Sequence, residues 1–193
     1  MHISNKIAGS IFALNQIKNI LPIEIRKLVY NIVKSHLEYG IIIWGSSRCE
    51  QFKKVKTLQK KAVRIVSNKH FRAHCTPIFG NLELLKLEDL YKFNVLSFMH
   101  KYFYSKLPSS FVSMFNSLSD PNRTKSFKVE KVKLKSLESF PSVVFPKLWN
   151  ITPIIQKEIK SIKSFKKTLF LSFVDEYHQF QCKSHHCFSC ESH

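Results

Sequence analysis

Acidic residues, glycines and long apolar runs are all scarce in this sequence, and each shortage excludes a class of protein. The 193 residues contain 13 Asp and Glu against 31 Lys and Arg, a formal net charge of +18 at pH 7. Such an excess predicts attraction to polyanions, either nucleic acid or an anionic membrane surface. With only four Gly, the chain contains neither the dinucleotide-binding nor the P-loop glycine pattern, which excludes the common nucleotide-binding loops.

Apolar runs and cysteines bear on the compartment. No run approaches the roughly 18 apolar residues of a membrane-spanning helix, so we expect no transmembrane segment. Lys6 and Lys18 interrupt the N-terminal segment, which does not have the pattern of a signal peptide. The five Cys are an odd number, so we expect reduced thiols rather than a secreted disulfide framework. These features predict an intracellular protein, in either the nucleus or the cytoplasm.

Apolar residues recur with helical spacing along almost the whole chain. The pattern predicts an all-α fold, a helical bundle of about six to eight helices with a loop-rich interruption near 116–140. We also expect a loop over 67–80, a weakly alternating edge strand over 132–135 and an N-cap at Ser164. The expected helices cover 7–20, 22–39, 49–66, 82–104, 109–115, 143–150, 153–162 and 164–177, with a short packed segment at 41–44. The expected core includes Leu28, Ile32, Leu58, Val63, Leu87 and Phe98.

The same pattern divides the chain into four segments. Residues 1–115 are a helical region, 116–142 a loop-rich linker and 143–180 a set of C-terminal helices. Residues 181–193 form a tail rich in Cys and His, which we expect to be disordered.

A series of short segments follows a specific order along the chain, although each segment alone is a weak signal. The segments are Leu21–Pro22, Arg26–Tyr30, Ser35–Gly40, Trp44–Gly45, Leu58–Val66, His74–Phe79, Leu84–Tyr91, Leu107–Phe111, Leu148–Asn150 and Ser164–Leu169. This order resembles a region of non-LTR retrotransposon polyproteins, of the jockey-like and CR1-like groups. That region lies downstream of the reverse transcriptase palm, and the resemblance covers about residues 6–178.

The resemblance implies a C-terminal fragment of an RNA-directed DNA polymerase, with residues 1–115 thumb-like or connector-like and with the fingers and palm absent. Nucleotidyl transfer needs carboxylates that hold two metal ions about 4 Å apart. The family supplies these carboxylates from a palm strand with an aromatic-x-Asp-Asp motif, and no Asp-Asp pair occurs in this chain. We therefore expect no catalysis by this chain alone. The partners that the resemblance implies are nucleic acid and a reverse transcriptase palm.

Other candidate catalytic and stacking groups have structural interpretations. Glu88–Asp89 and Asp175–Glu176 lie in helical patterns, and we interpret both pairs as solvated helix faces. His36 lies beside an apolar stripe and is interpreted as a packing residue rather than a catalytic base. Trp44 and Trp149 could stack on bases, but their apolar neighbours favour core packing.

The most specific candidate for a nucleic-acid surface is Phe52–Val66, within the helix expected over 49–66. At about 100° per residue, its apolar side chains fall on one arc and its basic side chains on the opposite arc. No carboxylate interrupts the basic arc, and like charges four residues apart destabilise a helix, so a phosphate backbone is a natural source of compensation. Lys-rich decoration of an exposed face is the alternative. The basic arc consists of Lys53, Lys54, Lys56, Lys60, Lys61 and Arg64.

The C-terminal tail contains the only cluster typical of metal ligands. Cys187 and Cys190 have the Cys-x-x-Cys spacing that lets two thiolates share a tetrahedral zinc. Cys182 and His193 would complete four ligands, with His185 or His186 as substitutes. The alternative is a disordered or read-through tail, and no other cofactor is expected.

Three functional alternatives stay open at this point. The chain could be a helical protein-interaction module, an adhesive surface for anionic membranes, or a non-functional retrotransposon relic. Salt distinguishes the first, because contacts between apolar surfaces survive high ionic strength whereas phosphate binding does not.

Overall fold

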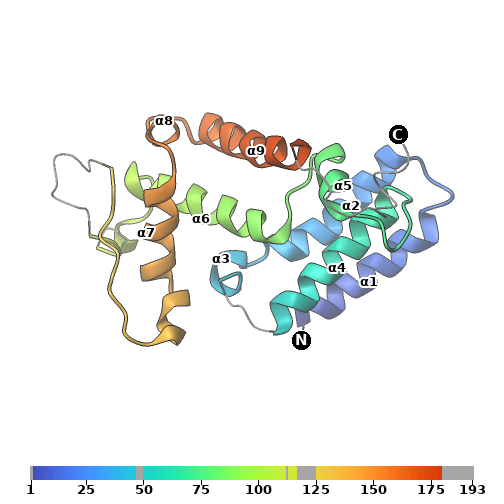
Figure 1. Ribbon diagram of the computed structural model, residues 1–193, viewed down its shortest axis with the longest axis horizontal. Coiled ribbons are helices and arrows are strands. Elements are labelled where there is room, and N and C mark those ends of the chain that lie inside the picture. The colour runs from blue at the N-terminus through green and yellow to red at the C-terminus, as the bar shows by residue number, and fades with distance from the viewer. Residues whose placement is uncertain (1, 47–49, 112, 117–124, 180–193) are drawn as a thin grey trace. The chain divides into compact units, whose positions relative to one another are not determined.

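The computed structural model describes residues 2–46, 50–111, 113–116 and 125–179. Within these ranges the chain forms nine α-helices and no strand, which confirms the predicted all-α fold (Figure 1). Two of the nine, α3 (Ile41–Trp44) and α8 (Ile154–Lys157), are single turns of four residues. None of the described helices combines the length and the apolar character of a membrane-spanning segment.

The described residues group into two compact units that are not consecutive stretches of chain. Their boundaries differ from the predicted divisions near 115 and 142, because α6 (Leu87–Phe103) and α9 (Ile162–His178) each contribute to both units. Unit 1 comprises the described residues of Met1–Ile41, Arg48–Asp89 and Ser172–His193, and unit 2 comprises those of Ile42–Ser47 and Leu90–Leu171.

Unit 1 is built around three long helices that lie side by side, α1 (His2–Ile17), α2 (Ile23–Glu38) and α4 (Glu50–Val66) (Figure 1). α4 packs against both of the others and against the short helix α5 (Cys75–Asn81). Each fully buried apolar side chain contributes about 1.5–3 kcal/mol through the hydrophobic effect. The side chains that are at most 1% exposed include Ile7, Leu14, Tyr30, Val33, Leu37, Ala62, Val63 and Val66.

The buried face of α2 is displaced around the helix from the one that its apolar pattern predicts, because Arg26 and Tyr30 are buried beside the expected Val33 and Leu37. Leu28 and Ile32 are 62% and 53% exposed, so the prediction that they belong to the core was wrong. The core prediction was right for Val63 and Leu87, which are both 0% exposed. Leu58 and Phe98, also predicted to be buried, are half-buried.

Polar contacts explain why this face of α2 points inward. Arg26 is 8% exposed, and its Nη1 donates to the carbonyl of Ile65 in the last turn of α4, 3.2 Å away. A cation at this position is favoured by the partial negative charge of a helix C-terminus. Buried Gln59 of α4 donates from Nε2 to the Tyr30 hydroxyl at 3.3 Å and to the Leu85 carbonyl at 2.9 Å. A pattern of apolar residues alone does not record these pairings.

The expected loop over 67–80 contains α5, so that prediction was wrong over its second half. Nδ1 of His74 accepts from the backbone N–H of Thr76 at 3.4 Å and caps the helix N-terminus. Pro77 lies in the first turn, where its missing N–H has no partner to lose. The Pro that suggested a loop therefore marks a helix start.

α6 begins later than predicted, at Leu87 instead of residue 82. Glu83 has a φ of 52°, a left-handed conformation that interrupts a right-handed helix. α6 then runs to Phe103, one residue short of the predicted end.

Two further local predictions were wrong. Residues 132–135 form no strand, and a 3-10 helix, η3 (Lys135–Ser139), begins at the last of them. α9 begins at Ile162, and the hydroxyl of Ser161 accepts from the backbone N–H of Ser164 at 3.4 Å. Ser161 therefore takes the capping role that was predicted for Ser164.

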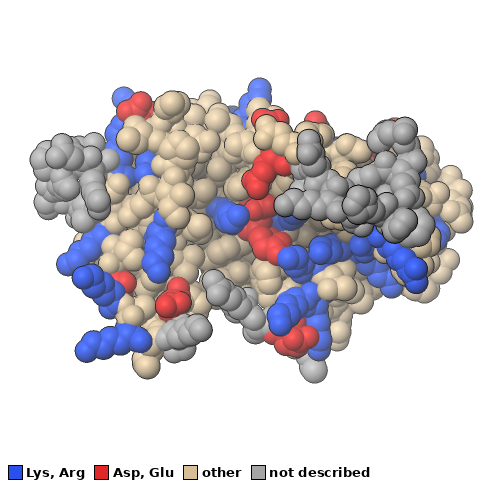
Figure 2. Space-filling model, viewed as in Figure 1, with Lys and Arg blue, Asp and Glu red and all other residues tan. Residues whose placement is uncertain are grey.

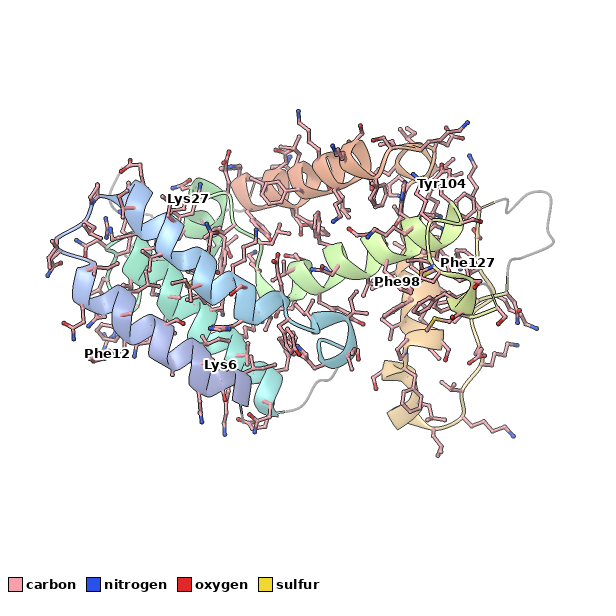
Figure 3. All side chains as sticks on the ribbon, turned by 180° about the vertical axis from the view of Figure 1, so that it is seen from behind. Lys6, Phe12, Lys27, Phe98, Tyr104 and Phe127 are labelled. Carbon is pink, nitrogen blue, oxygen red and sulfur yellow. The ribbon has the colours of Figure 1, made fainter. Side chains whose placement is uncertain are left out.

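Unit 2 has an aromatic cluster that includes buried Phe127 and half-buried Phe98 and Tyr104 (Figure 3). Trp149 of α7 (Pro141–Ile151) is 0% exposed, which confirms the prediction that it packs in the core. The Asn150 side chain pairs with both backbone groups of Phe127, at 2.9 and 2.8 Å. These bonds hold part of the predicted linker against α7.

Candidate nucleic-acid interface

The six basic residues predicted on α4 lie on the side of the helix away from its buried residues. Figure 2 shows Lys and Arg side chains gathered over this helix. The sequence contains no Asp or Glu from residue 51 to residue 82, so Glu50 in the first turn is the one acidic residue of α4, and the loop that follows the helix has none. Lys53, Lys54 and Lys61 are exposed, and Lys56, Lys60 and Arg64 are half-buried.

Two cavities open beside α4, and Arg64 lines both of them. Cavity A, of about 370 Å³, is lined by α4, by the loop and first turn of α5 over 72–76, and by residues 86–89. Half of the predicted basic face points into it, joined by cations from outside the helix. The cations that line cavity A are Lys56, Lys60, Arg64, Arg72 and Lys86, and the carboxylates are Glu88 and Asp89.

The chain itself neutralises part of cavity A. Lys56 forms an ion pair with Glu88, and the two side chains are 40% and 36% exposed. Asp89 is only 8% exposed, so the prediction that it lies on a solvated helix face was wrong. The Tyr177 hydroxyl donates to Asp89 Oδ2 at 2.5 Å. Asp89 therefore ties the start of α6 to the end of α9 within unit 1.

The charges and the burial of cavity A shift the pKa values of two of its side chains, His74 and Lys86. Burial lowers the pKa of His74, and the nearby cations Lys60, Lys86 and Arg64 lower it further. Burial also lowers the pKa of Lys86, against the opposing effect of Asp89 and its acidic neighbours. Burial disfavours a charge of either sign, so only the part of the His74 shift that comes from the three cations shows that a further positive charge is unfavourable beside His74.

Cavity B, of about 540 Å³, lies on the other side of the basic face and contains no carboxylate. It is lined by the end of α1 and the residue that follows it, by α4, and by the loop after α4. Its four cations come from three parts of the chain, and an aromatic pair completes the wall. The lining residues are Asn15, Lys18, Thr57, Lys61, Arg64, Ile65, Lys69, His70 and Phe71.

The predicted basic face is thus divided between three environments. Lys56 and Lys60 line cavity A, Lys61 lines cavity B, and Lys53 and Lys54 line neither. The helical pattern could not identify the cations that other segments bring to these cavities. Those residues are Lys18, Lys69, Arg72 and Lys86, together with Phe71.

The other sequence-predicted sites lie elsewhere. His36 and Trp44 are half-buried, and Asp175 and Glu176 are exposed, as expected for a solvated face. The proposed zinc ligands, Cys182, Cys187, Cys190 and His193, with the alternatives His185 and His186, lie outside the described residues. Within the described part of the chain, no three His, Cys, Asp or Glu side chains are grouped as metal ligands would be.

Comparisons with family models, with curated proteins and with solved structures find no match to this chain. The two cavities, their charge and the exposed groups around them are therefore the features that bear on function.

Proposed function

We propose that this chain binds the phosphate backbone of nucleic acid, without sequence preference, through α4 and the cations that join it in cavities A and B. The observation that carries the proposal is cavity B, where four cations from three parts of the chain converge with no carboxylate. Lys supplies charge without reading base edges, so the contacts would position a backbone rather than select a sequence.

Within this proposal the chain acts as the C-terminal, post-palm part of a non-LTR retrotransposon reverse transcriptase. The support is the order in which the short sequence segments follow one another from Leu21 to Leu169. It would hold nucleic acid for a palm that another part of such a polyprotein supplies. The proposal assigns no nucleotidyl transfer to this chain. A primer-extension assay with the purified chain should show no incorporation, and incorporation above background would contradict this assignment.

The direct test is the salt dependence of binding to a labelled duplex. Each phosphate contact lowers log affinity by about 0.9 per unit of log salt concentration on duplex DNA. Replacement of Lys53, Lys60 and Lys61 by Gln should therefore lower that slope by about 2 to 3 and leave the helix content unchanged.

A matched control separates a local site from net charge. Lys147, Lys163 and Lys167 are exposed lysines of unit 2, and their replacement by Gln removes the same total charge. The control variant should keep the wild-type slope. Equal losses in the two triple variants would show that only net charge attracts the duplex, and would contradict a site on α4.

A second candidate function has its own observation. Ile25, Leu28 and Ile32 form an apolar stripe on α2 that is 40–62% exposed, opposite the buried face of that helix. Such a stripe is typical of helices that bind other proteins. A protein complex held by this stripe should survive salt concentrations that abolish nucleic-acid binding, and should be lost on replacement of Leu28 and Ile32 by Ser.

A further inference from the structure

Phe71 is an exposed aromatic residue in the wall of cavity B, whose charged lining residues are all cations. Its side chain is 68% exposed, and it lines cavity B together with Lys61, Arg64 and Lys69. Exposed apolar residues occur singly on many proteins and need no special explanation. The Phe71 ring differs from such residues, because it lies among cations and on a loop that hydrogen bonds hold at both ends.

The start of the loop is held by the end of α4. Asn68 has a φ of 50°, and the two hydrogen bonds of a Schellman motif accompany this left-handed turn. The N–H of Asn68 donates to the Ile65 carbonyl at 3.1 Å, and the N–H of Lys69 donates to the Arg64 carbonyl at 2.9 Å. Lys69 is thereby fixed beside the last turn of the helix.

The far end of the loop returns to the same helix. Arg64 Nε donates to the Ala73 carbonyl at 2.9 Å, and the Ala73 N–H donates to the His70 carbonyl at the same distance. The Phe71 ring contacts both of its chain neighbours and is still 68% exposed: its centroid is 4.4 Å from that of His70, whose ring is tilted by 44°, and the Arg72 guanidinium carbon lies over the ring at 5.1 Å from the centroid.

We propose that cavity B and Phe71 form a binding site for single-stranded nucleic acid, in which a base stacks on Phe71 while neighbouring phosphates contact Lys18, Lys61 and Lys69. This inference rests on the proposed function and narrows it to one form of the ligand. Bases of a duplex are already stacked on both faces, so only an unpaired base can use an exposed ring. A basic groove combined with aromatic platforms is the usual arrangement of proteins that bind single strands without sequence preference.

The volume of the site agrees with this choice. A cavity of about 540 Å³ falls in the range that holds a small molecule, which suits one or two nucleotide units and not the width of a duplex. Because every base has an aromatic face, the site would tolerate any base.

The test compares three ligands and three proteins by fluorescence anisotropy. The ligands are a labelled 12-nucleotide single strand, an abasic 12-mer with the same phosphates, and the duplex form of the 12-mer. The proteins are the wild type, Phe71→Ala and Phe140→Ala. Phe140 is a matched control, since its side chain is 52% exposed and it belongs to unit 2.

Phe71→Ala should weaken binding of the base-containing single strand by about 5- to 150-fold, which is the usual effect of removing one stacked base contact. Its salt slope on that strand should equal that of the wild type, because no charge is lost. Affinity for the abasic strand should not change. Phe71→Trp should retain binding, and Phe140→Ala should behave as the wild type on all three ligands.

The possible failures are distinguishable. If the wild type binds neither single strand nor duplex at low salt, the proposed function fails. If it binds both with a steep salt slope but Phe71→Ala equals the wild type on the base-containing strand, backbone binding stands and this inference is overturned. Equal losses of the base-containing and abasic strands on Phe71→Ala would also overturn it, because they would show a role for Phe71 that does not involve a base.

Discussion

Replacement of Tyr177 by Phe tests the hydrogen bond between Tyr177 of α9 and Asp89 of α6 within unit 1. Tyr177 is 2% exposed, and its hydroxyl donates to Asp89 Oδ2 at 2.5 Å. The Tyr177 hydroxyl oxygen also accepts a hydrogen bond from the backbone N–H of Lys86 at 3.2 Å. Phe keeps the ring and removes both hydrogen bonds, so packing should change little while a buried carboxylate loses a donor.

The expected loss can be estimated from these contacts. A hydrogen bond to a charged group contributes about 1.5–3 kcal/mol, and the bond to the Lys86 N–H adds about 0.5–1.5 kcal/mol. Water will compensate some of this, since Asp89 retains 8% of its exposure. We expect Tyr177→Phe to lower the free energy of unfolding by about 2–3 kcal/mol.

The assay is urea unfolding followed by far-ultraviolet circular dichroism. Both tryptophans, Trp44 and Trp149, belong to unit 2, so tryptophan fluorescence would report a unit that does not contain the substituted residue. A double-mutant cycle with Asp89→Asn isolates the pair, and its interaction free energy should be about 1–2 kcal/mol. A loss under about 0.5 kcal/mol, or strictly additive effects in the cycle, would refute the reasoning.

Three further predictions concern other parts of the chain. Leu28→Ala should change the free energy of unfolding by less than about 0.5 kcal/mol, because Leu28 is 62% exposed. Leu37→Ala should lower it by about 2–5 kcal/mol, because Leu37 is 0% exposed. A larger loss for Leu28→Ala than for Leu37→Ala in urea titrations would show that the predicted face of α2 is the buried one. Glu88→Gln should release Lys56 from its ion pair and so raise the affinity for duplex DNA. The slope of log affinity against log salt concentration should rise by up to about 1, and the free energy of unfolding should fall by under about 1 kcal/mol. An unchanged slope would exclude Lys56 from the interface. Burial lowers the pKa of His100 below its usual value of 6.5, so the unfolded chain binds a proton that the folded chain excludes. The melting temperature should therefore fall as the pH drops below about 6.5, and the fall should stop once the pH is below the lowered folded-state pKa. His100→Gln should flatten this decline and exposed His70→Gln should not, and equal pH profiles for wild type and His100→Gln would contradict the role of His100.

The helices that could be predicted from the sequence are those with a single, unambiguous apolar arc. α4 was expected over 49–66 and occupies 50–66, because its basic and apolar residues separate cleanly at helical spacing. In α2 the apolar residues are spread over a wider arc, and periodicity placed Leu28 and Ile32 in the core, where the structure does not have them. The buried face carries Arg26 and Tyr30, whose polar tips find partners on α4 only when that face is buried.

The same limit applies to the candidate site. Lys61 and Arg64 were identified because they share a helix face, which is a local property of the sequence. Phe71 and Lys69 lie in a loop whose shape depends on the left-handed turn at Asn68, and Lys18 arrives from a distant part of the chain. No periodic pattern connects these three residues to α4, so only the fold could bring them to one cavity.

The repulsion along α4 links the sequence argument to the proposed function. Lys56, Lys60 and Arg64 follow one another at intervals of four residues, and each like-charged pair costs a few tenths of a kcal/mol. The chain relieves the two outer members, since Lys56 pairs with Glu88 and Arg64 donates to the Ala73 carbonyl. The Lys60 ammonium forms no ion pair within the described residues, and it is one of the charges that lower the pKa of His74. A chain selected for stability alone would gain from an acidic or neutral residue at position 60. Within the proposed function, a phosphate of the bound strand would compensate the charge of Lys60.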